Sequence, residues 1–264
     1  MDLVDCDAVV AYGAPMSVNE LETAGRLKVI SCHSCPPELR SAAADRGIVV
    51  HEVPTLWETV ADLTAGLVLA GARQIPQADA AVRHGQWSRA DLKVRFSGRD
   101  VFGRTLGIVG LGRIGALLAR RMSGFDMRML YHDIRRRPDL ESAFGLRFAR
   151  LTEVVAAADF LVVLVPLNNS TRGLMDDAMF QLMKRDAFFI NTSRGAVVDE
   201  DALIRALRSR RIAGAALDVF TREPLASDSP LLELSNVVLT PHLGGSTLDS
   251  DMALVEAVRR RLRD

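Results

Sequence analysis

The sequence LGIVGLGRIG at residues 106–115 is the clearest indication of the fold of this 264-residue chain. Its apolar first half predicts a buried parallel strand that ends at Gly110. In GLGRIG, Gly110 would permit a tight turn, Gly112 would let a pyrophosphate approach the backbone, and Gly115 would let the next helix pack close to the strand. The free amide groups at the start of that helix would then face an anion. The stretch therefore predicts a strand, a turn and a helix that together hold a dinucleotide.

An aspartate in the expected place strengthens this prediction. Asp133 follows a second strand-like run at residues 127–131 and lies about 20 residues beyond the glycine turn, where a dinucleotide-binding unit places a carboxylate for the adenosine ribose hydroxyls. The alternative, an ordinary turn and a surface aspartate, is disfavoured by the order of strand, turn, helix, strand and acid. Asp133 would repel a 2′-phosphate, so NAD is favoured over NADP. Three arginines at residues 135–137 would either partly offset that repulsion or form a solvated loop. Because of the first possibility, NADP stays an alternative cofactor.

Composition excludes several classes of protein. With 48% hydrophobic residues, the chain can bury a sizeable core as one large domain or two modest ones. Acidic and basic residues balance at 33 each, which argues against a nucleic-acid-binding protein. No apolar run approaches the ~20 residues of a membrane span, and the acidic start MDLVDCD does not resemble a secretory signal. The expected location is the cytoplasm, with neither nucleic acid nor membrane as a partner.

The three cysteines, Cys6, Cys32 and Cys35, suit a reducing compartment better than a disulfide framework. Cys32-His33-Ser34-Cys35 has CxxC spacing, but a structural zinc site needs two further ligands, and the chain has no second CxxC and no HxxxH to supply them. Neither metal binding nor redox chemistry is therefore expected. Buried thiols or thiols in a turn are the favoured interpretation.

The chain before the glycine turn has an α/β pattern that is too short for a complete domain. The run ETVADLTAGLVLAGAR at residues 58–73 is apolar on more than one face, which predicts a helix buried between two lobes. The polar segment 75–101, broken by Gly85 and Gly98, predicts either a connecting excursion that makes subunit contacts or a solvated loop. The other expected elements are strands at residues 8–11, 28–31 and 48–51 and helices around residue 20 and at 38–45.

After the glycine turn, strands and helices alternate regularly. This alternation predicts right-handed crossovers and a doubly wound parallel sheet with helices on both faces. Ligands of such sheets bind at the carboxyl ends of the strands, so the polar residues that follow each strand become site candidates. The expected strands are residues 160–165, 187–190, 213–217 and 237–239, and the expected helices are residues 152–157, 177–183 and 199–208.

Four charged or titratable side chains follow these strands. Arg194 comes after the strand at 187–190, Asp218 directly follows the strand at 213–217, Glu223 lies on the loop beyond it, and His242 follows the strand at 237–239. Taken singly, each is more often an ordinary loop residue. Because they stand on consecutive strand ends, we expect them to face one crevice beside the cofactor.

The chemistry of carbonyl reduction explains these residue types. Hydride delivery to a ketone builds negative charge on its oxygen, so the site needs a proton donor and a cation. A histidine beside a carboxylate keeps its proton near neutral pH, because the opposite charge favours the imidazolium. A guanidinium can grip the α-carboxylate of the substrate with two parallel hydrogen bonds, which a lysine does with less geometric control.

In family order and with family-like spacing, these motifs resemble the D-isomer-specific 2-hydroxyacid dehydrogenases, which include glyoxylate/hydroxypyruvate reductases and 3-phosphoglycerate dehydrogenase. The resemblance runs from about residue 49 to residue 246 and rests on VADLTAGLVLAGAR, GLGRIG, INTSRGAVVDEDAL, AALDVF, REPL and TPHLGG. It implies that Arg194 binds the substrate, that His242 is the acid/base and that Glu223 is its partner. The cofactor contacts that it implies, beyond Gly110, Gly112, Gly115 and Asp133, are Arg113, Ile114, Thr192, Ser193 and, on the nicotinamide side, Asp218.

The chain departs from the family pattern in three places. The family normally has a further strand and helix before the region where this chain starts and a longer end, of which VEAVRRRLRD resembles a shortened final helix. The substrate-binding loop after the strand at 28–31, glycine-rich in the family, here reads CHSCPPELR, and Pro36 and Pro37 cannot donate amide hydrogens. Together, these departures predict an incomplete substrate lobe with altered substrate selection.

The resemblance thus implies an α/β protein with a doubly wound Rossmann cofactor domain at residues 74–243. A smaller, truncated flavodoxin-like substrate lobe would comprise residues 1–73 and a returning segment at 244–264. The expected function is hydride transfer between NAD and a small 2-oxo or 2-hydroxy acid such as glyoxylate or hydroxypyruvate, in a homodimer. Two alternatives stay open, namely a non-catalytic NAD(H)-binding or corepressor-like module and an NADP-preferring reductase of a bulkier keto acid.

Overall fold

The computed structural model describes residues 3, 5–11, 16–32, 35–52, 56–88 and 90–263. The chain divides into two compact units. The small unit comprises Met1–Thr59 and Gly245–Asp264, and the large unit comprises Val60–Gly244. Among the described residues, no helix is long and apolar enough to cross a bilayer.

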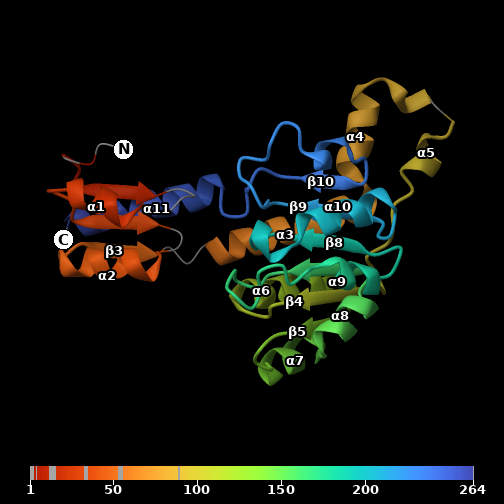
Figure 1. The fold of residues 1–264 in the computed structure, drawn as a ribbon, viewed down its shortest axis with the longest axis horizontal. Coiled ribbons are helices and arrows are strands. Elements are labelled where there is room, and N and C mark those ends of the chain that lie inside the picture. The colour runs from red at the N-terminus through yellow and green to blue at the C-terminus, as the bar shows by residue number, and fades with distance from the viewer. Residues whose placement is uncertain are drawn as a thin grey trace. The chain divides into compact units, whose positions relative to one another are not determined.

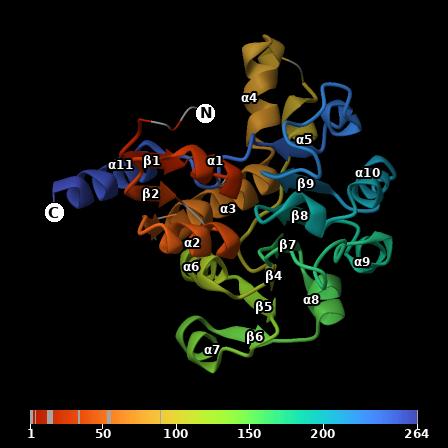
Figure 2. The same cartoon turned by 60° about the vertical axis from the view of Figure 1, so that its left-hand side comes forward.

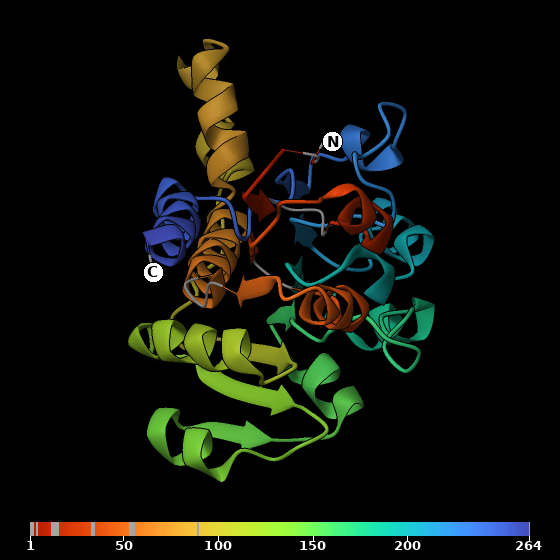
Figure 3. The same cartoon turned by 90° about the vertical axis from the view of Figure 1, so that its left-hand side faces the viewer.

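The small unit is a three-stranded parallel sheet with helices on both faces (Figure 3). Its strands follow chain order, β1-β2-β3, and the buried residues of α1 and α2 share a core with Ile30 and Cys32 of β2. A capping box starts α1, since Ser17 Oγ accepts from the Glu20 N–H and the Glu20 carboxylate accepts from the Ser17 N–H. The elements are β1 (Ala8–Ala11), α1 (Val18–Thr23), β2 (Val29–Cys32), α2 (Pro37–Asp45), β3 (Val49–Glu52) and α11 (Leu248–Arg263).

The large unit contains a seven-stranded parallel sheet in the order β10-β9-β8-β7-β4-β5-β6 (Figures 1 and 2). Strand order reverses at β4, because β5 and β6 follow on one side and β7 to β10 on the other. This reversal is the point at which doubly wound sheets bind their ligands. The strands are β4 (Thr105–Val109), β5 (Arg128–His132), β6 (Leu146–Phe148), β7 (Phe160–Val163), β8 (Phe188–Asn191), β9 (Gly214–Leu217) and β10 (Val237–Leu239).

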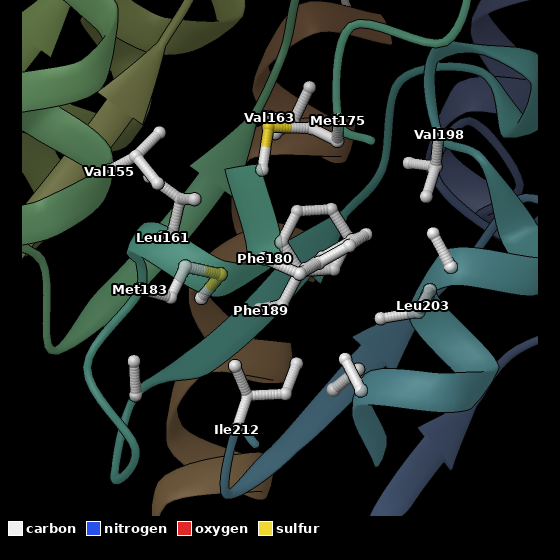
Figure 4. Close-up of a cluster of buried hydrophobic side chains, with 14 of the residues drawn as sticks. Val155, Leu161, Val163, Met175, Phe180, Met183, Phe189, Val198, Leu203 and Ile212 are labelled. Carbon is white, nitrogen blue, oxygen red and sulfur yellow. The ribbon is translucent and has the colours of Figure 1, made fainter. Parts of the chain in front are cut away.

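Each face of the large sheet packs on its own set of helices. One core joins α3 (Leu56–Arg73) and α6 (Arg113–Met122) to one face. The other joins α8 (Leu151–Ala157), α9 (Asp177–Leu182) and α10 (Glu200–Arg208) to the opposite face. Figure 4 shows the centre of this second core, where the rings of Phe180 and Phe189 meet edge to face with centroids 5.3 Å apart. The doubly wound architecture expected from the sequence is therefore confirmed.

The boundary between the units differs from the expected one at residues 73 and 74. Leu67, Val68 and Ala72 of α3 pack in the core of the large sheet, so most of this helix belongs to the large unit. The expected helix at residues 58–73 itself is confirmed within two residues.

Two segments contain more regular structure than the sequence predicted. The excursion at residues 75–101 forms α4 (Ile75–Arg83), a 3-10 turn at Gln86–Ser88 and α5 (Leu92–Arg95). Because several of its apolar side chains, such as Trp87 and Val94, point to solvent, no buried stripe marks these helices. Between β5 and β7, α7 (Pro138–Phe144) and the edge strand β6 were also not predicted, although a proline at the helix start and a glycine just after its end are typical helix boundaries.

Candidate active site

The glycine turn after β4 has the geometry that its sequence predicts. Gly110 adopts φ +99°, a conformation that L side chains rarely take. A Cβ on Gly115 would lie 2.4 Å from the carbonyl oxygen of Gly110, so only glycine lets α6 start this close to the strand. Around Gly112, which caps α6, a Cβ would meet no atom within 4 Å. The N-terminal amides of α6 therefore border open space that suits a pyrophosphate.

Asp133 stands at the carboxyl end of β5, next to this turn. Its carboxylate accepts from the Leu111 N–H at 2.6 Å and from the Arg135 N–H at 3.1 Å. The carboxylate is thus fixed beside the glycine turn, as the expected ribose contact requires. Ile134, which follows it, is 96% exposed and offers an apolar surface beside the carboxylate.

Two of the three arginines after Asp133 form ion pairs with nearby carboxylates. Arg136 makes a bidentate ion pair with Glu141 at 2.8 and 2.7 Å, and Arg137 makes one with Asp139 at 3.0 and 2.7 Å. The Arg136 hydrogen bond lowers the pKa of Glu141 to about 2, so this carboxylate is charged at neutral pH. These two guanidinium groups are therefore drawn toward α7 and are not available to attract a 2′-phosphate without breaking these pairs.

The loop after β8 carries Arg194 and is held in place by hydrogen bonds among its own residues and the last residue of β8. Asn191 Oδ1 accepts from the N–H and hydroxyl of Ser193, and Asn191 Nδ2 donates to the Arg194 carbonyl at 3.1 Å. The exposed Arg194 side chain donates to the Ser193 carbonyl through one Nη, at 2.7 Å. Its remaining guanidinium donors leave it able to grip a carboxylate. The next residue, Gly195, lies so close to Phe220 that a Cβ would come within 1.9 Å of that backbone, which packs this loop against the one after β9.

Asp218 follows β9 and is 1% exposed. One carboxylate oxygen accepts from the Thr240 hydroxyl at 2.6 Å and the Leu243 N–H at 2.7 Å, and the other accepts from the Gly244 N–H at 2.8 Å. The backbone carbonyl of Asp218 also accepts from the His242 N–H at 2.9 Å. Asp218 therefore anchors the turn that carries His242, and its second oxygen keeps one acceptor position for a ligand.

His242 and Glu223 form a hydrogen-bonded pair. His242 Nδ1 lies 2.6 Å from Glu223 Oε2, and the other oxygen of Glu223 accepts from the Phe220 N–H at 2.9 Å. An ionised carboxylate only accepts, so Nδ1 carries the proton in this bond and Nε2 is the atom left to exchange a proton with a substrate. Both side chains are partly exposed, at 47% and 36%. His242 adopts a left-handed backbone conformation, φ +53°, which its anchored turn maintains.

The structure thus places the predicted residues at the strand ends of one sheet, or on the loops and the helix that follow these ends, and joins several of them directly. It pairs His242 with Glu223 and links Asp133 to the glycine turn. It also reveals Thr64 of α3, which was not predicted from the sequence and which contacts Thr192. Arg113 and Ile114 open α6 beside the open space at Gly112.

The thiols of the CxxC segment are buried in the small unit. Cys32 and Cys35 are both free and belong to the core between the sheet and its first two helices, whereas His33 and Ser34 lie outside the described residues. Burial, together with the neighbouring Cys35 and Glu52, raises the pKa of Cys32 to about 11. Burial also raises the pKa of Cys35. Thiols of this kind are poor nucleophiles at neutral pH.

We expect Cys32 to resist alkylation in the native protein at pH 7. With a pKa of about 11, only about one molecule in 10⁴ carries the reactive thiolate at pH 7, and the rate should rise about tenfold per pH unit below the pKa. Iodoacetamide labelling followed by peptide mass spectrometry measures this, with partly exposed Cys6 as the internal reference and unfolded protein as the control. Labelling of native Cys32 at pH 7 as fast as that of Cys6 would contradict the expectation.

Comparisons with known proteins agree with this arrangement. Residues 65–244 match the family model of the D-isomer specific 2-hydroxyacid dehydrogenase, NAD binding domain. The chain is 42% identical over 262 residues to the glyoxylate reductase of Korarchaeum cryptofilum, covering 98% of this chain and 79% of that protein. Among solved structures, the NADPH-dependent glyoxylate/hydroxypyruvate reductase of Sinorhizobium meliloti in complex with citrate has a TM-score of 0.79 and 33% identity, covering 97% of this chain and 80% of that one.

A second solved structure extends the range of relatives. The apo form of Rhodotorula graminis D-mandelate dehydrogenase has a TM-score of 0.81 and 28% identity, covering 95% of this chain and 77% of that one. The match to the family model spans the glycine turn, the aspartate and all three predicted catalytic residues. The chain belongs to the D-isomer-specific 2-hydroxyacid dehydrogenase family and is an oxidoreductase that acts on CH–OH donors.

Proposed function

We propose that this protein is an NAD-dependent reductase of a small 2-oxo acid, with glyoxylate or hydroxypyruvate as substrate. The pair of His242 Nδ1 and Glu223 Oε2 at 2.6 Å carries this proposal, because it prepares a proton donor at the carboxyl edge of the sheet. The relatives named glyoxylate reductase and glyoxylate/hydroxypyruvate reductase support the substrate class. Arg194, on the neighbouring loop, supplies the cation that such an acid requires.

The residues have separate tasks in this reaction. The Arg194 guanidinium binds the α-carboxylate of the substrate and polarises the adjacent carbonyl. His242 donates a proton from Nε2 to the carbonyl oxygen as negative charge builds there, and Glu223 stabilises the imidazolium through Nδ1 and holds the ring in place. Asp218 keeps the turn of His242 in position through its bonds to Thr240, Leu243 and Gly244. In the oxidative direction His242 accepts the proton instead.

The residues after β4 and β5 fit a nicotinamide dinucleotide. The open space at Gly112 and the N-terminal amides of α6, with Arg113 and Ile114, would hold the pyrophosphate, and Asp133 would accept from the adenosine ribose hydroxyls. Thr192, Ser193 and Asp218 would border the nicotinamide half across the strand reversal. The cofactor supplies the hydride. We propose NAD as the preferred cofactor, because Asp133 carries a negative charge and Arg136 and Arg137 are held by Glu141 and Asp139.

Asp133→Asn should shift the cofactor preference toward NADP. The amide oxygen can still accept from the Leu111 N–H, but the charge that repels a 2′-phosphate is lost, so the ratio of NADPH to NADH affinity should rise by about 10- to 100-fold. Fluorescence titration with each reduced cofactor measures the ratio. Asp126→Asn, at the amino end of β5, is the matched control and should leave it unchanged. If the wild-type protein bound NADPH more tightly than NADH, the proposed preference for NAD would be wrong.

Turnover with a panel of 2-oxo acids tests the proposed function. NADH oxidation at about neutral pH, where the histidine can be protonated, should occur with glyoxylate or hydroxypyruvate and be slower with pyruvate and phosphohydroxypyruvate. NADH binding is followed by fluorescence in parallel. Tight NADH binding without turnover on any of these acids would favour a non-catalytic NAD(H)-binding module. A cytoplasmic location and a homodimer stay predictions.

A further inference from the structure

A buried threonine pair joins α3 to the loop that carries Arg194. Thr64 is fully buried, and its Oγ1 lies 2.7 Å from Thr192 Oγ1 and 2.7 Å from the carbonyl oxygen of Val60, one helical turn earlier. Thr192 is 6% exposed. Both residues belong to the large unit, and the hydrogen bond between them is buried.

Counting protons fixes the direction of the two bonds. The Val60 carbonyl can only accept, so Thr64 donates its single hydroxyl proton to it. Thr64 then has no proton left for Thr192, and Thr192 must be the donor in the second bond. The Thr192 proton is therefore turned toward α3, and the two free lone pairs of its oxygen make it an acceptor for any further partner.

The position of Thr192 in the sheet connects this bond to cofactor binding. Asp133 follows β5 on one side of the strand reversal, whereas Thr192 follows β8 on the other side. A dinucleotide lies across such a reversal, with the adenosine half on the side of the acidic residue. The loop of Thr192 therefore serves the nicotinamide half, and the same loop carries Arg194 two residues later.

We propose that Thr64 is a positioning residue for the nicotinamide half of the cofactor, acting through the Thr192 hydroxyl. This inference rests on the proposed function, because it assumes that the crevice holds NAD. Thr64 holds the Thr192 side chain in one orientation and ties the loop at residues 192–194 to α3. Asn191 holds the same loop from its other end through Ser193 and Arg194.

Thr64→Val removes the hydroxyl and keeps the shape of the side chain. We expect it to weaken NADH binding about three- to tenfold, because the Thr192 hydroxyl loses its buried partner and its fixed orientation. ADP-ribose, which lacks the nicotinamide ring, should bind within about twofold of wild type, since it uses the glycine turn and Asp133. Both affinities are measured by calorimetry or by competition against NADH fluorescence.

Two further variants separate positioning from general destabilisation. Thr64→Ser keeps the hydroxyl and should restore NADH affinity to within about twofold of wild type. Thr192→Val removes the same bond from its other side, and it replaces Thr64→Val if that variant does not fold. Both substitutions remove the same hydrogen bond. In a double-mutant cycle, the variant with both valines should therefore bind NADH as tightly as whichever single variant has the lower NADH affinity.

Equal weakening of NADH and ADP-ribose in Thr64→Val, no weakening of either, or failure of Thr64→Ser to restore binding would overturn the inference. These outcomes are distinct from a failure of the proposed function. A wild-type protein that binds NADH but turns over no 2-oxo acid would remove the proposed activity and leave the binding comparison intact. A wild-type protein that binds no NADH would overturn both.

Discussion

Replacing His242 with alanine should lower kcat for reduction of the 2-oxo acid by about 10²- to 10⁴-fold, the range expected for loss of a general acid. NADH affinity should stay within about twofold of wild type, because the imidazole is placed to act on the substrate and not on the cofactor. The 2.6 Å bond from Nδ1 to Glu223 leaves Nε2 as the only ring atom that can exchange a proton with the substrate. Steady-state kinetics and fluorescence titration measure the two quantities.

The left-handed backbone of His242 requires a second variant. Alanine at φ +53° is strained, so a loss of activity in His242→Ala could also come from a shifted turn. Asparagine tolerates this conformation and keeps a polar side chain, but it cannot act as a general acid near neutral pH. We expect His242→Asn to lose activity to the same extent. Activity near wild type in His242→Asn, or equal loss of NADH binding in both variants, would show that the assigned role is wrong.

The strand ends of this chain could be predicted from sequence because their pattern is local. An apolar run, a glycine or polar residue and then a helix is visible within a few residues, and the parallel topology follows from alternation alone. The sequence alone therefore sufficed to place Gly110, Asp133, Glu223 and His242 at one edge of a sheet. The family resemblance implied that Glu223 is the partner of His242, and the structure brings them together because β9 and β10 are neighbouring parallel strands.

Other features depend on contacts between distant segments and carry no local signal. The bond from Thr64 to Thr192 joins residues 128 positions apart, and threonine in an apolar helix is unremarkable by itself. The buried state of Asp218 likewise follows from donors on a turn that comes later in the chain. Helices α4 and α5 were missed because apolar side chains such as Val82 and Val94 face solvent, which removes the stripe that marks an amphipathic helix.

Arg194→Ala should lower kcat/KM for the 2-oxo acid by about 10²- to 10³-fold, since the site loses both the grip on the carboxylate and a cation beside the developing oxyanion. Arg194→Lys keeps the charge but not the planar pair of donors, so it should recover only part of this loss. If Arg194 chiefly binds the carboxylate, the substitution should mainly raise KM. If Arg194 also stabilises the transition state, the substitution should lower kcat as well. Kinetics over a range of glyoxylate concentrations separate the two contributions.

The structure offers a matched control for this prediction at the other end of the same strand. Arg185 is exposed and precedes β8, whereas Arg194 follows it. Arg185→Ala removes the same guanidinium from the amino edge of the sheet, where no ligand of a doubly wound sheet binds, so its kcat/KM should stay within about twofold of wild type. The Arg194 carbonyl, which accepts from Asn191 Nδ2, is retained in every variant, and NADH affinity should therefore change little. A loss in Arg185→Ala as large as in Arg194→Ala would mean that net charge, and not a carboxylate site at the end of β8, governs the reaction.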